Sequence, residues 1–114
     1  MNSCAAFILR SYRDVMDRPT LDEALQNREA VLRAFVVPDG SLRSMPTRLA
    51  KRLVVLNQVA QSFPIGETWP EQEVNDRLSR FLPDVAMLRR HLVDEGFLER
   101  RDGRYWRAGG TTDL

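Results

Sequence analysis

The stretch that decides the fold is LRRHLVDEGFLERRDGRYWR, residues 88–107. Its first half places apolar residues at helical spacing beside two adjacent arginines, a pattern that predicts an amphipathic helix. Gly96 follows as a left-handed helix terminator. Two short aromatic and basic runs then flank Asp102-Gly103, the strongest short-range signal for a β-hairpin. A helix followed by a hairpin can read a DNA groove or simply close a small fold, so this order alone leaves both interpretations open.

The segments upstream extend the pattern. Apolar periodicity predicts helices over about residues 47–62, 70–81 and 83–95, and residues 67–69 are expected to form one short strand. Pro70 suits the first turn of its helix, where its missing N–H costs nothing. Helix, strand, helix, tight turn, helix and hairpin is the order of a winged helix-turn-helix. We therefore predict a mostly α (α+β) fold, with a winged-helix domain over 39–108 and a β-hairpin wing over 97–107.

Two extra helices are predicted ahead of this domain. The first covers about residues 5–16, and a capping box from Thr20 to Glu23 opens a second that runs to Phe35. Val54 and Val55 lie outside the main apolar face of the 47–62 helix, so we expect an N-terminal helix or a partner subunit to cover them. Residues 1–38 are thus predicted to be a capping or dimerisation segment, and residues 109–114 a disordered tail.

The composition is that of a soluble globular protein, with 43% hydrophobic and 29% charged residues. A net charge of +1 is far from that of strongly basic nucleic-acid coat proteins. The single cysteine, Cys4, cannot form an internal disulfide, which fits a reducing compartment, and its role stays open. No apolar run approaches the roughly 18 residues of a membrane span, and a signal peptide is not indicated. A cytoplasmic location is therefore expected.

Motifs for catalysis or cofactor binding are missing from the sequence. It has no glycine-rich phosphate loop, no Cys-His pair and no ligand set at metal spacing. His91 is the only histidine, and zinc usually needs three or four suitable ligands. We therefore expect no enzymatic activity, no cofactor and no metal.

Residues 40–107, about 60% of the chain, resemble an uncharacterised bacterial family, the domain of unknown function numbered 2087. Several separated motifs carry the resemblance: Gly40-Ser-Leu42 with Pro46, Lys51-Arg-Leu-Val-Val-Leu56, Phe63, Glu73-Val-Asn75, Asp84, Leu88-Arg-Arg90, Leu92-Val-Asp94, Gly96 and Tyr105-Trp106. Trp69 stands where the family more often has tyrosine, and Pro70 where a capping threonine is usual. The family occurs alone or joined to helix-turn-helix regulators. The resemblance therefore implies transcription by association, and it implies no catalytic residue.

The two arginines of the 83–95 helix have different expected roles. Arg89 borders the apolar side, so we expect its stem to lie on apolar surface and its head to pair with Glu73 or Asp94. A phosphate contact is the alternative for Arg89. Arg90 lies on the opposite face, where it would reach guanine in the major groove or pair with Asp94 as an ordinary solvated arginine.

Other candidates surround that face of the 83–95 helix. Met87 and His91 share it with Arg90. The hairpin contributes four arginines, which alternation must divide between its two faces, namely Arg100, Arg101, Arg104 and Arg107. Arg101 and Arg104 flank the turn and are the predicted phosphate contacts of a wing. Alternatively, the charge only keeps an edge hairpin soluble.

A further basic cluster opens the 47–62 helix. Arg48 and Lys51 are its main members, together with Arg43 and Arg52. In a winged helix this helix end can lie near the DNA backbone, although a run of charge on a helix is usually just a solvated face. We include Arg48 and Lys51 among the candidate DNA contacts.

The leading hypothesis is a small transcriptional regulator that binds double-stranded DNA as a homodimer through its N-terminal helices. The 83–95 helix would enter the major groove and the wing would touch the backbone. The alternative is a winged-helix module that binds a protein partner through Met87, His91 and Trp106. Positive potential continuous from Arg48 to Arg101 would favour DNA, and carboxylates interrupting it would favour protein.

Overall fold

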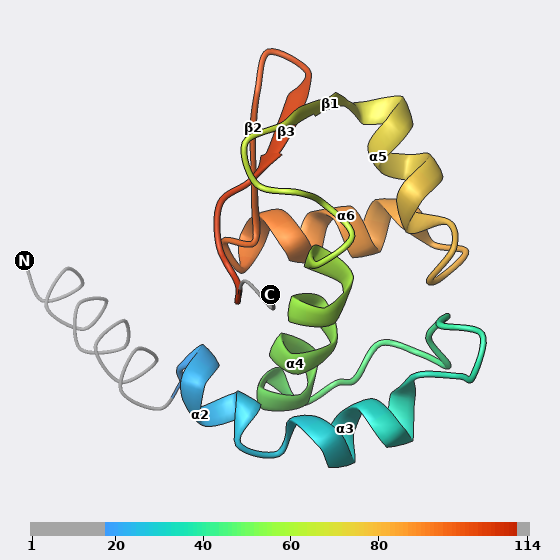
Figure 1. The fold of residues 1–114 in the computed structure, drawn as a ribbon, viewed down its shortest axis with the longest axis vertical. Helices are drawn as coiled ribbons and strands as arrows, with labels where there is room; N and C mark the ends of the chain where they lie inside the picture. Colours follow the sequence, from blue (N-terminus) through green and yellow to red (C-terminus); the bar gives the residue numbers. More distant parts are fainter. Residues whose placement is uncertain (1–17, 112–114) are drawn as a thin grey trace, which may run out of the picture.

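The computed structural model describes residues 18–111, which form five helices and a three-stranded antiparallel sheet (Figure 1). The elements are α2 (Leu21–Leu25), α3 (Arg28–Phe35), α4 (Leu49–Ala60), β1 (Thr68–Pro70), α5 (Glu71–Leu78), α6 (Val85–Asp94), β2 (Leu98–Arg101) and β3 (Arg104–Arg107). The predicted α+β class and the predicted order of elements from α4 to β3 are confirmed. The helix predicted over 5–16 lies outside the described residues.

The segment ahead of α4 begins as predicted but breaks in the middle. The Thr20 hydroxyl oxygen accepts a hydrogen bond from the Glu23 backbone N–H at 3.1 Å, which confirms the cap. The prediction of one continuous helix to Phe35 was wrong, because α2 ends at Leu25 and α3 begins at Arg28. Asn27, a weak helix former, leaves the helical region between them, with φ −106° and ψ 23°.

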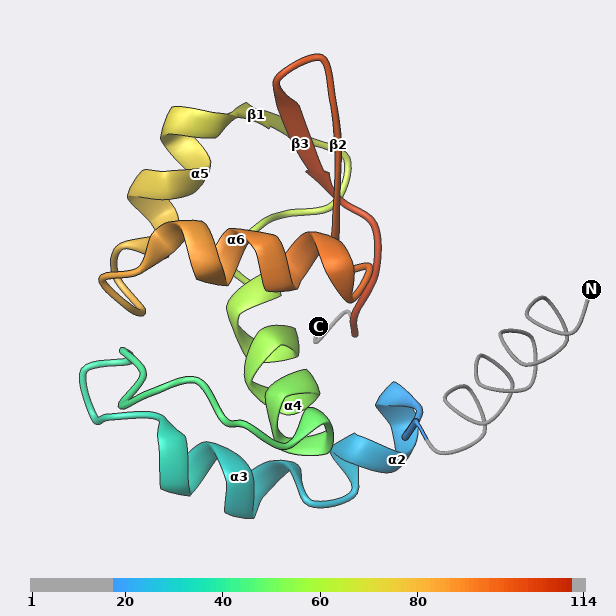
Figure 2. The ribbon, with the colours of Figure 1, turned by 180° about the vertical axis from the view of Figure 1, so that it is seen from behind.

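Helix α4 is the central element of the fold. Helices α2 and α3 pack against it near its first turns, and α6 crosses its other end (Figures 1 and 2). Val54 and Val55 are only 1% and 0% exposed. The expectation that another element covers these valines is therefore confirmed, and α2 and α3 are the N-terminal elements that lie on α4.

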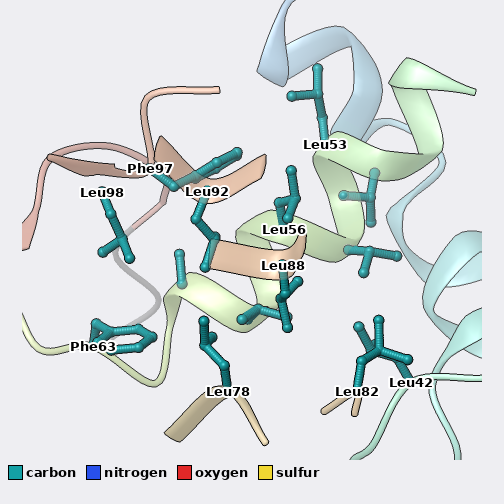
Figure 3. Close-up of a cluster of buried hydrophobic side chains, with 14 of the residues drawn as sticks. Leu42, Leu53, Leu56, Phe63, Leu78, Leu82, Leu88, Leu92, Phe97 and Leu98 are labelled. Atoms are coloured by element: carbon teal, nitrogen blue, oxygen red, sulfur yellow. The ribbon is translucent and has the colours of Figure 1, made fainter. Parts of the chain in front are cut away.

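The core fills the space between α4, α5, α6 and the sheet. Figure 3 shows leucines from all three helices meeting Phe63, Phe97 and Leu98. Leu88 and Leu92 of α6 are fully buried, as the sequence predicted for that side of the helix. Burial of these side chains fixes α6 against α4 and leaves its opposite side outward.

The sheet has the strand order β1-β3-β2, so the hairpin strand β3 lies in the middle. Asp102 and Gly103 form its turn with φ values of 53° and 78°, the backbone that a type I′ turn needs, and the predicted hairpin is confirmed. Pro70 ends β1 and caps α5 instead of occupying the helix's first turn as predicted. Helix α5 thus begins at Glu71, one residue later than predicted, and Pro70 is its N-cap residue.

The chain after β3, which includes the start of the tail expected over 109–114, is hydrogen-bonded to the fold as far as Thr111. The Ala108 N–H donates to the Phe97 carbonyl at 2.9 Å. The Thr111 N–H donates to Oδ1 of the buried Asn57 at 2.9 Å, and Asn57 Nδ2 donates to the Thr111 hydroxyl at 3.0 Å. Residues 108–111 are therefore attached to Phe97, just before β2, and to α4, whereas residues 112–114 lie outside the described part.

Candidate nucleic-acid interface

A depression of about 270 Å³ lies between α6 and the hairpin. Helix α6 contributes most of its lining and the sheet the remainder: Ala86, Arg89, Arg90, Val93, Asp94, Arg100 and Tyr105. Ala86, Arg90 and Asp94 follow one another at i, i+4 spacing, and all three are exposed. Three arginines and one carboxylate therefore line the surface where the helix meets the hairpin.

Capping residues define both ends of helix α6, which carries most of the lining of the depression. The Asp84 carboxylate accepts a hydrogen bond from the Met87 N–H at 3.1 Å, so the helix begins at Val85 and not at Pro83 as predicted. Gly96 ends the helix with φ +81°, in the left-handed region that glycine tolerates. The prediction of Gly96 as terminator is confirmed.

The register of the hairpin decides which arginine faces α6. Arg100 pairs directly with Tyr105, so both side chains lie on one face of the sheet. Alternation places Arg101 and Arg104 on the other face, where Arg104 Nη2 donates to the Thr68 hydroxyl at 2.8 Å. The predicted wing arginines thus remain exposed at the turn, but the depression is lined by Arg100.

Arg100 was not among the candidates chosen from the sequence. The signal was nevertheless present, because a two-residue Asp-Gly turn places residue 100 opposite residue 105. A hydrogen-bonding interaction with the Tyr105 hydroxyl raises the pKa of Arg100 above its ordinary value, and attraction to Glu71 and Asp94 acts in the same direction. Because an arginine is protonated at any physiological pH, Arg100 places a positive charge beside α6.

A polar network from α5 supports the depression. The Tyr105 hydroxyl donates to Glu71 Oε1 at 2.8 Å, and the Arg89 Nε lies 3.7 Å from the same oxygen. Arg89 Nη1 also donates to the Asn75 side-chain oxygen. Arg89 pairs with a carboxylate as expected, but the partner is Glu71 and not Glu73 or Asp94. Arg89 instead faces Glu71 and Asn75 on α5, and the half-buried position favours its structural role.

The predicted partner Glu73 is engaged elsewhere. Its carboxylate lies 3.6 Å from the Arg77 guanidinium, one turn further along α5, in an i, i+4 pair. The Arg77 guanidinium also stacks over the rings of Phe63 and Trp69, at 5.7 and 5.1 Å from their centroids. Arg77 therefore joins α5 to Phe63, which follows α4, and to Trp69 of β1.

Removing the Tyr105 hydroxyl tests the network beneath the depression. Tyr105→Phe keeps the buried ring but deletes the hydrogen bond to Glu71, so we expect the free energy of unfolding to fall by about 1 kcal/mol. Urea denaturation measures the change. Glu71→Gln is the control, because an amide oxygen still accepts from Tyr105 and the loss should be smaller. An unchanged unfolding midpoint in Tyr105→Phe would contradict the assigned bond.

The remaining α6 candidates occupy different surroundings. Arg90 is exposed, whereas Met87 and His91 are half-buried. Met87 packs against the core, which corrects its placement on the face opposite the core. Contacts from both α4 and α5 cover more of α6 than one narrow stripe. Trp106 lies on the face of the sheet opposite Tyr105, so the depression does not include the predicted protein-binding trio.

The basic cluster of α4 lies at the other end of the molecule. Arg48 and Lys51 border a groove with α2 and α3. Both views place the first turn of α4 beside those helices and far from the hairpin (Figures 1 and 2). The structure therefore brings Arg89, Arg90 and Arg100 together, but it does not join them to Arg48 and Lys51 in one surface along α4.

Two observations concern other classes of site. Between residues 18 and 111, no three His, Cys, Asp or Glu side chains gather where they could hold a metal ion. Within the same span, every helix is too short or too polar to cross a membrane.

Comparison with known proteins identifies one relationship. The model of the family described as an uncharacterized protein conserved in bacteria (DUF2087) matches residues 41–107. This match covers α4 to β3 and so includes the whole depression. No curated protein and no solved structure matches the chain significantly.

Proposed function

The chain belongs to this bacterial family, and from that premise we propose that residues 39–108 are a winged helix-turn-helix that binds double-stranded DNA. The convergence of Arg89 and Arg90 from α6 with Arg100 from β2 on one depression is the observation that carries this proposal. The order of helices and the β1-β3-β2 sheet support it, because a winged helix places a reading helix beside a hairpin. The role would be that of a small transcriptional regulator.

The exposed strip of α6 suits the major groove. Ala86 is small and allows close approach, and Arg90 extends from the next turn toward base edges. A bidentate contact from arginine to guanine contributes about 1–3 kcal/mol of discrimination. Asp94 would accept a hydrogen bond from the amino group of cytosine, the pairing that a carboxylate makes in this groove.

The hairpin would contact the backbone. Arg100 faces the helix side of the sheet and Arg101 lies at the turn, so the two would reach phosphates on either side of the wing. Such contacts position the protein without reading sequence. Arg89 would then orient the helix through Glu71 and Asn75 and leave base recognition to Arg90.

Fluorescence anisotropy of a labelled random duplex at two salt concentrations tests this proposal. We expect binding that weakens steeply with salt, because arginines that neutralise phosphates release counterions. Arg100→Ala and Arg101→Ala should each weaken binding and reduce the salt slope by about 1, whereas Arg90→Ala should weaken binding to preferred sequences most. Arg33→Ala, at an exposed site on α3, is the matched control and should change nothing.

Absence of binding at tens of micromolar protein in low salt would overturn the proposal, as would an equal loss in Arg33→Ala. A module that binds protein is the second candidate. It is favoured by the carboxylate of Asp94 among the arginines and by the separation of Arg48 and Lys51 from the hairpin. In that case the duplex titration would fail while the fold remained intact.

A further inference from the structure

A second concave surface lies between α2, α3 and the first turns of α4. It encloses about 660 Å³, within the range of about 300–1,000 Å³ that is typical of binding pockets. Ala24 and Val31 are buried in its floor, and Ala30 and Ala34 are exposed one turn apart on α3. These small side chains leave room for the close approach of an apolar helix.

The rim of this groove carries charges of both signs. Glu23 lies on the α2 side, and Arg48 and Lys51 lie on the α4 side. A purely anionic ligand would meet Glu23, and a purely cationic one would meet two positive charges. The rim therefore suits an amphipathic peptide that carries both acidic and basic residues.

The chain itself contains such a peptide immediately before the groove. At 100° per residue Ile8, Tyr12 and Val15 fall within about 60° of one another, so residues 5–16 form an apolar stripe if helical. Arg13 and Asp14 lie outside that stripe and supply both charges. Pro19, three residues after this segment, is part of the groove lining.

The connection between the segment and the groove favours a second copy over the same chain. Thr20 is extended, with φ −76° and ψ 163°, and Pro19 restricts both itself and Arg18 to extended geometry. The Arg18 guanidinium is also bound to Glu95 at the end of α6, at 2.5 Å. A short, stiff connection of this kind cannot readily turn back on itself, and such hinges favour exchange between protomers.

We propose that the groove between α2, α3 and α4 receives residues 5–16 of a second copy, and that the exchange is reciprocal. Each dimer then fills two grooves and buries Ala30 and Ala34 beneath the incoming segment. This dimer would set two hairpins and two α6 helices around one twofold axis. It does not depend on DNA binding, and its test uses no DNA.

Light scattering of the full chain at tens of micromolar gives the first test. We expect a mass of twice 13.1 kDa for the unaltered protein and of 13.1 kDa for Ala34→Glu and Ile8→Asp. Arg33→Glu adds the same carboxylate to α3 outside the groove and should remain dimeric. If Ala34→Glu fails to fold, the mass of Ile8→Asp still tests the proposed dimer, since residue 8 is not part of the described core. A monomeric parent, or a dimer that survives both substitutions, would overturn the proposal.

Single-cysteine chains distinguish exchange from self-docking. In a Cys4→Ser background, Ile8→Cys chains are mixed with Ala34→Cys chains and oxidised mildly. Exchange predicts a disulfide-linked species that contains one chain of each kind. A chain carrying both cysteines that instead closes an internal disulfide and stays at 13.1 kDa would show that the groove is filled in cis, and would overturn the exchange.

Discussion

Replacing Arg107 by methionine is expected to lower the free energy of unfolding by about 3–5 kcal/mol. Arg107 is only 8% exposed, and its Nη1 donates to the carbonyl oxygens of Ala60 at 2.8 Å and Phe63 at 3.2 Å. Its Nε and Nη2 donate to the carbonyls of Gly109 and Thr111. One side chain thus joins the end of α4, β3 and the chain after the sheet.

The size of this effect follows from what the substitution leaves behind. The last carbonyls of a helix have no partner within it, and a cation near that end also interacts favourably with the helix dipole. Methionine keeps an apolar stem but has no donor. The Ala60 carbonyl would then keep only its bond from the Phe63 N–H, and the Phe63 carbonyl would lose the Arg107 donor, which costs about 1–3 kcal/mol for a buried group left unpaired. Urea denaturation followed by circular dichroism measures the loss.

Two substitutions serve as controls for Arg107→Met. Arg104→Met removes an exposed arginine from the same strand and should change stability by no more than about 0.5 kcal/mol. Arg107→Lys keeps the charge but not the planar fork, and its stability should fall between those of the parent and Arg107→Met. A loss below about 1 kcal/mol in Arg107→Met would contradict the role of this side chain as a cap of α4.

The burial of Arg107 also shows what strand alternation can and cannot predict from the sequence. Strict alternation places residue 107 on the same face as residue 105, so a buried Tyr105 implies that Arg107 points inward. Alternation alone makes the adjacent Tyr105 and Trp106 point to opposite faces of the sheet, and it leaves open which of the two is buried. That choice depends on α5, which presents Glu71 to the Tyr105 hydroxyl.

Elements with strong local sequence signals were predictable because those signals act through the backbone of a few neighbouring residues. Thr20, Gly96 and the Asp102-Gly103 turn each act through a backbone conformation that needs a particular residue type, so their positions can be read without tertiary information. The break at Asn27 was missed, because it lets both α2 and α3 lie on α4, and this packing is a tertiary property.

The site was predictable by element but not by residue. A helix and a hairpin with arginines were expected at α6 and at β2-β3, and Arg90 is exposed as expected. The partner of Arg89 could not be read from the sequence, since Glu71 and Glu73 are two residues apart and only the packing of α5 decides which one faces α6. The separation of Arg48 from the hairpin likewise depends on the direction of α4.

The last prediction separates folding from recognition on the two sides of α6. Leu88 is fully buried between α6 and the rest of the core, so Leu88→Ala should lower the free energy of unfolding by about 3–5 kcal/mol. Arg90, two residues further along the helix, is exposed, so Arg90→Ala should change stability by no more than about 0.5 kcal/mol. Urea denaturation of both variants provides the comparison.

For DNA affinity the order of the two variants is reversed, and Arg90→Ala is expected to have the larger effect. Under conditions in which Leu88→Ala is folded, its duplex affinity should remain close to that of the parent, because Arg90 and Arg100 still line the depression. Arg90→Ala should fold normally and bind more weakly. If Arg90→Ala were the destabilised variant, its side chain would be supporting the fold, and α6 could not present it to a DNA groove. Because the two side chains lie on one helix, this comparison isolates the direction in which each points.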